Sequence, residues 1–176
     1  RFKEVLEDII NGQLTNDFWE ITLPLDLATS SSTSPSLYAY YAAQYVLGAN
    51  GLFSKLKVSD LLQEGLRSKK SALERHHLFP KAWLQRNGVP DQTQRNQIAN
   101  YALVEWSDNI NISDNHPKEY LPHYFDRLAT HEKESMYYWH ALPQNWEEME
   151  YEEFLVQRRK LISQVVKDAY LNISSG

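Results

Sequence analysis

Cysteine is absent from this sequence of 176 residues. Its absence excludes a disulfide scaffold, a thiolate zinc site and a cysteine nucleophile. Long hydrophobic runs are also missing, since no stretch approaches the roughly 18 uninterrupted apolar residues of a membrane span. The opening residues RFKEVLEDII follow the pattern of an amphipathic helix and not that of a signal peptide. We therefore expect no membrane partner and a cytoplasmic protein. The chain also begins without a Met, so we expect it to be a piece of a longer protein.

Positive charge is scarce overall but concentrated in the middle of the chain. The formal net charge is −5, yet residues 53–95 hold nine basic and four acidic side chains. A local positive field matters more for binding a polyanion than the total charge does. The apolar content of 42% is enough for a core, and the length fits one domain. The composition thus permits a single folded domain with one basic region.

The spacing of apolar residues predicts a mainly helical chain with two short strands. The strands are expected over residues 72–79 and 98–106. Asn145 and Glu148 form a capping-box pattern that predicts the start of a long C-terminal helix, whose charged face is expected in solvent. Pro117 is placed to begin a helix that continues to Leu121. Further helices are predicted over residues 2–10, 37–47 (apolar nearly all round and therefore buried) and 58–66.

The segment from Glu74 to Tyr120 contains side chains suited to phosphodiester hydrolysis. His76 and His77 are adjacent on the first predicted strand, and Asn100 and Asn109 lie on and after the second. Hydrolysis of a phosphodiester needs a base that is neutral near pH 7, a divalent cation and a group that orients the base. Two strands and a helix with these residues are the layout of a ββα-metal nuclease site. Two ordinary polar side chains at a strand end are the alternative interpretation of the histidine pair.

The adjacency of the two histidines poses a geometric question. Neighbouring residues on a regular strand point to opposite faces of a sheet. His76 and His77 can face one common site only if the strand bends there, and Pro80 marks the end of the strand close behind them.

Two runs of sequence, ERHHLFPKAWL and NQIANYALVEWSDNINISDNHPKEYL, resemble HNH endonucleases. They are most similar to the C-terminal HNH domain of the GmrSD-type restriction enzymes, which act on modified DNA. In those proteins a His-Ile/Leu-x-Pro strand precedes an Asn-bearing strand, and a second Asn follows nine residues later, as Asn109 follows Asn100 here. The segment LPLDLATSSSTSPSLYAYYAAQYVLGANGLFSK also resembles the part that precedes this motif. The resemblance covers roughly residues 17–122.

The resemblance implies a mainly α fold with a small ββα-metal core over about residues 72–122. It further implies that His77 is the general base, while Asn100 holds the loop and orients that base. His76 and Asn109 would then ligate one divalent cation, with Mg²⁺ as the first expectation and Mn²⁺ or Ni²⁺ better suited to imidazole. Glu74 and His116 are accessory candidates. A neutral donor pair would bind the cation weakly until DNA phosphate completes the site.

The implied function is hydrolysis of DNA by the nuclease domain of a bacterial restriction or anti-phage protein, with an N-terminal NTPase-like module as its partner. Basic residues near the motif would contact the DNA backbone in a salt-dependent manner: Lys69, Lys70, Arg75, Lys81, Arg86 and Arg95. Two alternatives stay open, namely an inactive nucleic-acid-binding or partner-docking module with the same fold, and an RNA-directed nuclease. The sequence does not specify an oligomeric state.

Overall fold

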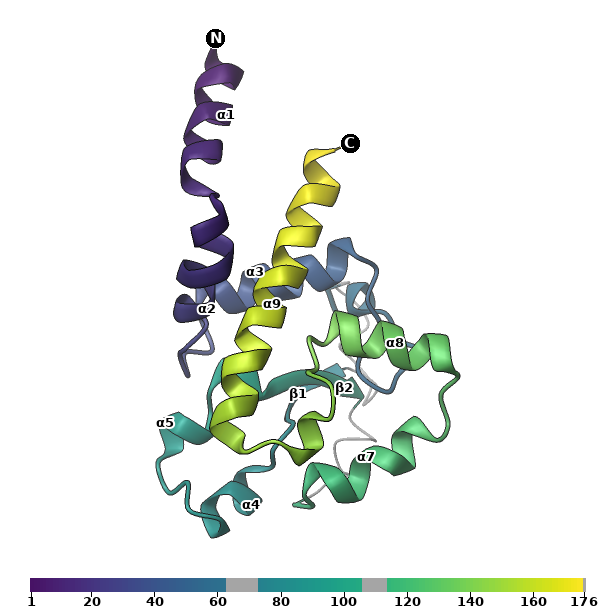
Figure 1. Cartoon of the computed structure of the whole chain (residues 1–176). Helices are drawn as coiled ribbons and strands as arrows, with labels where there is room; N and C mark the ends of the chain where they lie inside the picture. Colours follow the sequence, from purple (N-terminus) through teal and green to yellow (C-terminus); the bar gives the residue numbers. More distant parts are fainter. Residues whose placement is uncertain (63–72, 106–113, 176) are drawn as a thin grey trace.

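The computed structural model describes residues 1–62, 73–105 and 114–175. Within these residues the chain is mainly helical, with one two-stranded antiparallel sheet (Figure 1). The helices and helical turns are α1 (Phe2–Gln13), η1 (Phe18–Thr22), α2 (Leu23–Asp26), α3 (Pro35–Val46), η2 (Val58–Leu62), α4 (Lys81–Arg86), α5 (Gln92–Arg95), η4 (Ile98–Asn100), α7 (Pro117–Phe125), α8 (Thr130–Trp139), η5 (Trp146–Glu148) and α9 (Tyr151–Ser174).

The sheet consists of β1 (Leu73–His77) and β2 (Tyr101–Glu105). Both predicted strands are therefore confirmed, although each is shorter than its predicted range. The pairing is regular, with His76 opposite Ala102 and His77 opposite Tyr101. Three successive residues of β2, Ala102 to Val104, are buried, so both faces of this strand are covered. Coverage of both faces explains why residues 98–106 read as a nearly continuous apolar run.

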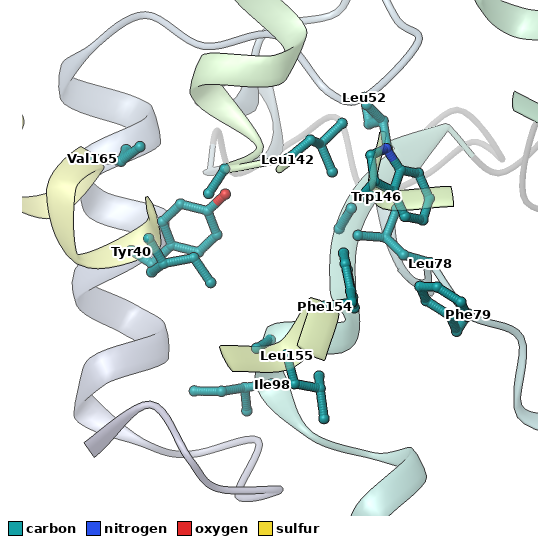
Figure 2. Close-up of a cluster of buried hydrophobic side chains, with 14 of the residues drawn as sticks. Tyr40, Leu52, Leu78, Phe79, Ile98, Leu142, Trp146, Phe154, Leu155 and Val165 are labelled. Atoms are coloured by element: carbon teal, nitrogen blue, oxygen red, sulfur yellow. The ribbon is translucent and has the colours of Figure 1, made fainter. Parts of the chain in front are cut away.

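The core is organised around α9, which packs on α3 and on the turn η4 that leads into β2. Figure 2 shows Phe154 of α9 near Trp146 and the residues that follow β1, and Leu155 of α9 beside Ile98 of η4. The Phe79 and Phe154 ring centroids lie 4.9 Å apart, and those of Trp146 and Phe154 lie 5.4 Å apart. Each fully buried side chain of this size contributes about 1.5–3 kcal/mol. The end of β1 is thus fixed directly to the C-terminal helix.

Helix α1 contrasts with this packed body. It forms where the sequence predicts a helix, but none of its residues is buried. Phe2 is 79% exposed, and Val5, Leu6, Ile9 and Ile10 also expose their apolar side chains. In Figure 1, α1 and the C-terminal end of α9 project from the same end of the molecule.

The start of the C-terminal helix differs from the capping-box prediction. Asn145 has a left-handed backbone (φ 54°) and precedes the short turn η5, and the helix begins only at Tyr151. Trp146 is fully buried, and the turn that carries it into the core occupies the residues predicted as the first helical turn. The prediction of a solvated charged face also fails at Arg158, which is fully buried.

The helix predicted over residues 37–47 begins earlier than expected, at Pro35, with Ser34 as its N-cap residue. It is not buried all round, because Tyr38 and Tyr45 are about half exposed. Residues 58–62 form a 3₁₀ turn, whereas the remainder of the helix predicted there lies outside the described residues. None of the helices in the described ranges is long and apolar enough to cross a bilayer.

Candidate functional site

The histidine pair lies at the end of β1, next to the chain that leaves the sheet. Because the pairing with β2 continues regularly through His77, the strand does not bend at the pair, and the two imidazoles point to opposite faces. His76 is 7% exposed, whereas His77 is half-buried. The bend that would direct both rings to one face is therefore not present.

His77 is held by a ring contact and a hydrogen bond. Its ring centroid lies 4.5 Å from that of Tyr101, its partner across the sheet. The Arg75 guanidinium lies 5.6 Å from the same Tyr101 ring. The Nε2 atom of His77 lies 3.1 Å from Oδ1 of Asn96. Since an amide oxygen only accepts hydrogen bonds, this geometry places the imidazole hydrogen on Nε2 and the lone pair on Nδ1.

Burial lowers the pKa of His77 from 6.5 to about 4. The hydrogen bond to Asn96 opposes this shift, while the positive charges of Lys81 and Arg75 add to it. The ring is therefore neutral at pH 7, which is the form that can accept a proton. The same two cations make the surroundings of His77 attractive to an anion.

Asn100 is fully buried and joins the chain that leaves β1 to the chain that begins β2. Its Oδ1 accepts from the Phe79 amide at 2.9 Å, and its Nδ2 donates to the carbonyl oxygens of Phe79 (3.0 Å) and Arg95 (3.2 Å). The Leu78 amide also donates to the Asn100 carbonyl at 2.8 Å. Asn100 thus has the geometry of a residue that holds the loop. The hydrogen bond to the His77 ring comes from Asn96, whereas the resemblance gives the role of orienting this ring to Asn100.

The segment that carries Asn96 is anchored at several points. Asp91 caps α5 by accepting from the Gln94 amide at 2.8 Å. The Tyr151 hydroxyl, from the start of α9, donates to the Gln94 carbonyl at 2.8 Å. Arg95 donates through Nη1 to the carbonyls of Val89 (2.9 Å) and Pro90 (2.6 Å). This guanidinium, predicted as a DNA contact, is therefore engaged with its own loop.

The other predicted DNA contacts divide into three groups. Arg75 and Lys81 are exposed, and both act electrostatically on His77. Arg86 is exposed but lies 3.9 Å from the Asp114 carboxylate. Lys69 and Lys70, like the predicted metal ligand Asn109, lie outside the described residues, as does the side chain of Glu74.

His116 has a local structural role. It is the N-cap residue of α7, and its Nδ1 accepts from the Lys118 amide at 3.2 Å. Its ring lies 4.5 Å from Trp83 and 5.7 Å from Phe79. A capping role accounts for this residue without a bound ion.

The donor chemistry determines what the site can hold. In the described ranges no group of three or more His, Asp or Glu side chains is placed to bind a metal ion. The predicted pair instead combines the His76 imidazole with the amide of Asn109. Both donor types suit a divalent cation that keeps several water ligands, so their chemistry fits the implied cation.

Asn96 is the functional candidate that the sequence does not reveal. It lies 19 residues from His77, and no helical or strand periodicity connects the two positions. The pairing of β1 with β2 and the hydrogen bonds of Asn100 and Tyr151 to the end of α5 bring them together.

In comparisons with known proteins, no family model, no curated protein and no solved structure matches this chain.

Proposed function

We propose that this chain is a metal-dependent HNH endonuclease that hydrolyses DNA phosphodiester bonds. The observation that carries the proposal is the half-buried His77, neutral at pH 7, at the end of a two-stranded sheet whose loop is tied by the buried Asn100. The combination provides a base of fixed orientation beside two exposed cations, Arg75 and Lys81. A general base must be both positioned and unprotonated: the hydrogen bond to Asn96 positions the His77 ring, and burial lowers its pKa and keeps it neutral.

In the proposed reaction the Nδ1 atom of His77 accepts a proton from water. The water oxygen forms the new bond to phosphorus, and the bond from phosphorus to the leaving sugar oxygen breaks. Arg75 and Lys81 hold the phosphate by charge. When bound by His76 and Asn109, a divalent cation would offset negative charge on the phosphate and the leaving oxygen.

His76 and His77 point to opposite faces of β1, and His76 is almost fully buried. The proposed role of His77 as the base does not depend on His76, whose role as a cation ligand is proposed from the sequence resemblance alone.

Incubation of supercoiled plasmid with the protein and Mg²⁺, Mn²⁺ or Ni²⁺ tests the proposal. We expect metal-dependent nicking, and we expect the His77→Ala variant to lower its rate by about 100-fold or more. His131→Ala is the matched control, since His131 is an exposed histidine on α8. Equal nicking by His77→Ala and wild type would refute the proposed base.

Two further outcomes separate the alternatives. DNA binding without nicking in any of the metals would favour an inactive nucleic-acid-binding or docking module. Cleavage of RNA in preference to plasmid would favour an RNA-directed nuclease. The restriction context, cytoplasmic location and NTPase-like partner module are proposed from the sequence resemblance alone.

A further inference from the structure

We infer that Asn96 is the positioning residue that fixes the ring orientation and the hydrogen placement of His77. The inference rests on the proposed function for its catalytic meaning, but its structural content stands by itself. Oδ1 of Asn96 lies 3.1 Å from Nε2 of His77 and is the acceptor for the imidazole hydrogen. The arrangement leaves the Nδ1 lone pair as the one that takes the proton from water.

The Asn96 side chain projects from a backbone whose position is set by the core. Its amide donates to the Gln92 carbonyl at 3.0 Å and closes α5. The preceding carbonyl, that of Arg95, accepts from the buried Asn100 at 3.2 Å. The Tyr151 hydroxyl of α9 fixes the residue before that. Because these hydrogen bonds hold the Asn96 backbone in place, the Asn96 side chain orients the His77 ring without a further loss of conformational entropy on substrate binding.

The ring of His77 has a second contact that completes its placement. Tyr101 lies against the imidazole at 4.5 Å, with the ring planes inclined by 59°. The Tyr101 contact restricts the position of the ring, but an aromatic ring does not distinguish the two ring nitrogens as Asn96 does. Asn96 therefore adds to the intrinsic preference of a neutral imidazole for the Nε2–H form, and without this acceptor the Nδ1–H form should be populated beside it.

The direction of the amide matters, because exchange of Oδ1 and Nδ2 would reverse the inference. In that arrangement Nδ2 would donate to Nε2, and the hydrogen would lie on Nδ1. The two arrangements respond oppositely to substitution. Asn96→Asp has only acceptor oxygens at this position, so it preserves the Nε2–H form of His77. If Nδ2 of Asn96 were the atom facing Nε2, the same substitution would remove the donor and disfavour the Nδ1–H form.

Long-range ¹H–¹⁵N spectra of the ¹⁵N-histidine-labelled protein at pH 7.5 test the hydrogen placement directly. We expect His77 to be an Nε2–H tautomer in the wild type and in Asn96→Asp, and a mixture in Asn96→Leu. Plasmid nicking should fall by about 10- to 100-fold in Asn96→Leu, as is usual when the partner that orients a functional histidine is lost. Asn96→Asp should retain more of the activity than Asn96→Leu.

Asn87→Leu is the matched control, because Asn87 is an exposed asparagine whose Nδ2 donates to the Trp83 carbonyl of its own turn at 2.8 Å. It should leave the His77 spectrum and the nicking rate unchanged. An Nδ1–H tautomer in the wild type, or an unchanged His77 spectrum in Asn96→Leu, would overturn the inference. If the expected tautomers are seen but the wild type does not nick DNA, the positioning role stands and the proposed nuclease function fails.

Discussion

At the scale of single residues, Arg158 shows how this fold accommodates a buried charge. Its guanidinium donates through Nε and Nη2 to the His140 carbonyl, at 3.1 Å each, and through Nη1 to the Ala99 carbonyl at 2.6 Å. Within the residues that the structure describes, it forms no ion pair with a carboxylate. Neutral carbonyl groups therefore stabilise the Arg158 charge. The hydrogen bond to the Ala99 carbonyl also joins α9 to the residue directly before Asn100.

Replacement of Arg158 should destabilise the fold strongly. Arg158→Leu leaves two buried carbonyl oxygens without their donors, which costs about 2–4 kcal/mol in the free energy of unfolding. Urea denaturation followed by tryptophan fluorescence measures this loss. Arg159→Leu, at the half-buried neighbouring position, serves as the control. A change below about 0.5 kcal/mol in Arg158→Leu would show that the network does not stabilise the protein.

The buried His140 should make the free energy of unfolding depend on pH. Its Nε2 donates to the Asn50 carbonyl at 2.8 Å, and burial lowers its pKa from 6.5 to about 4. The unfolded chain then binds a proton that the folded chain does not, so stability is highest above pH 6.5 and falls as the pH drops toward 4. This one residue accounts for a loss of about 2 kcal/mol between pH 7 and pH 5.

The measurement for this prediction compares urea denaturation of wild type and His140→Gln at pH 7 and pH 5. Glutamine does not titrate, so the loss of unfolding free energy between pH 7 and pH 5 should be about 2 kcal/mol smaller in His140→Gln than in the wild type. His77, whose pKa is lowered in the same direction, is present in both proteins and cancels in the comparison. Identical losses in the two proteins would mean that His140 is not neutral and buried in solution.

At the scale of elements, α1 is set apart from the cooperative unit. It has 12 residues and buries none of them. Isolated helices shorter than about 12–15 residues are marginal in water. We therefore expect removal of residues 1–13 to shift the melting temperature by less than about 2 °C, as circular dichroism can measure.

A truncation at the other terminus provides the contrast. Removal of residues 170–176 takes away Tyr170, whose ring lies 5.8 Å from that of Trp19 in the core. This truncation should lower the melting temperature clearly more than the first. A large loss on removal of residues 1–13 would show that α1 packs against the protein in solution.

Elements with strong local signals were predictable from the sequence. The second strand was predictable because residues 98–106 form a short, mostly apolar run after Asn-rich turn signals, and the first because Pro80 ends the short segment 72–79. Helix α1 was found because its apolar residues recur at helical spacing. That signal describes amphipathicity only, however, and it does not show whether the apolar stripe meets a partner.

Two features of the fold were not predictable, for different reasons. Helix α8 was missed because Met136 is its one buried residue, and the resulting apolar pattern is too weak to distinguish from a loop. The capping box at Asn145 was wrong because burial of Trp146 decides the local backbone, so that tertiary packing outweighs the local pattern there.

The candidate site also contains some residues that the sequence reveals and others that it does not. His76, His77 and Asn100 could be selected from residue type and spacing, and the structure brings His77 and Asn100 to the same end of the sheet. The engagement of Arg95 with its own loop could not be foreseen, because its partners are backbone carbonyls. The same holds for Asn96, since nothing in its local sequence distinguishes it from the other asparagines nearby.

At the scale of the whole molecule, binding of DNA must overcome a net charge of −5. The proposed contact therefore depends on a few cations, and among the described residues Arg75 and Lys81 are the exposed ones that act on His77. The double variant Arg75→Gln/Lys81→Gln should weaken DNA binding, and it should reduce the slope of log K against log salt by about 0.9 for each lost phosphate contact.

Fluorescence anisotropy across a salt series measures this slope. Lys160→Gln/Lys167→Gln on α9 removes the same charge far from His77 in the chain and serves as the control. An equal reduction in both double variants would indicate that only the overall charge matters. A larger reduction for the pair beside His77 would locate the DNA there.

The placement of the two chain ends has a practical consequence for such measurements. The free ends of α1 and α9 point away from the body on one side, while α4 and α5, which flank the sheet end carrying His77, lie on the other (Figure 1). Anchoring the protein to a sensor chip or a bead through either end would consequently present the histidine side outward, in a uniform orientation, to nucleic acid flowing past.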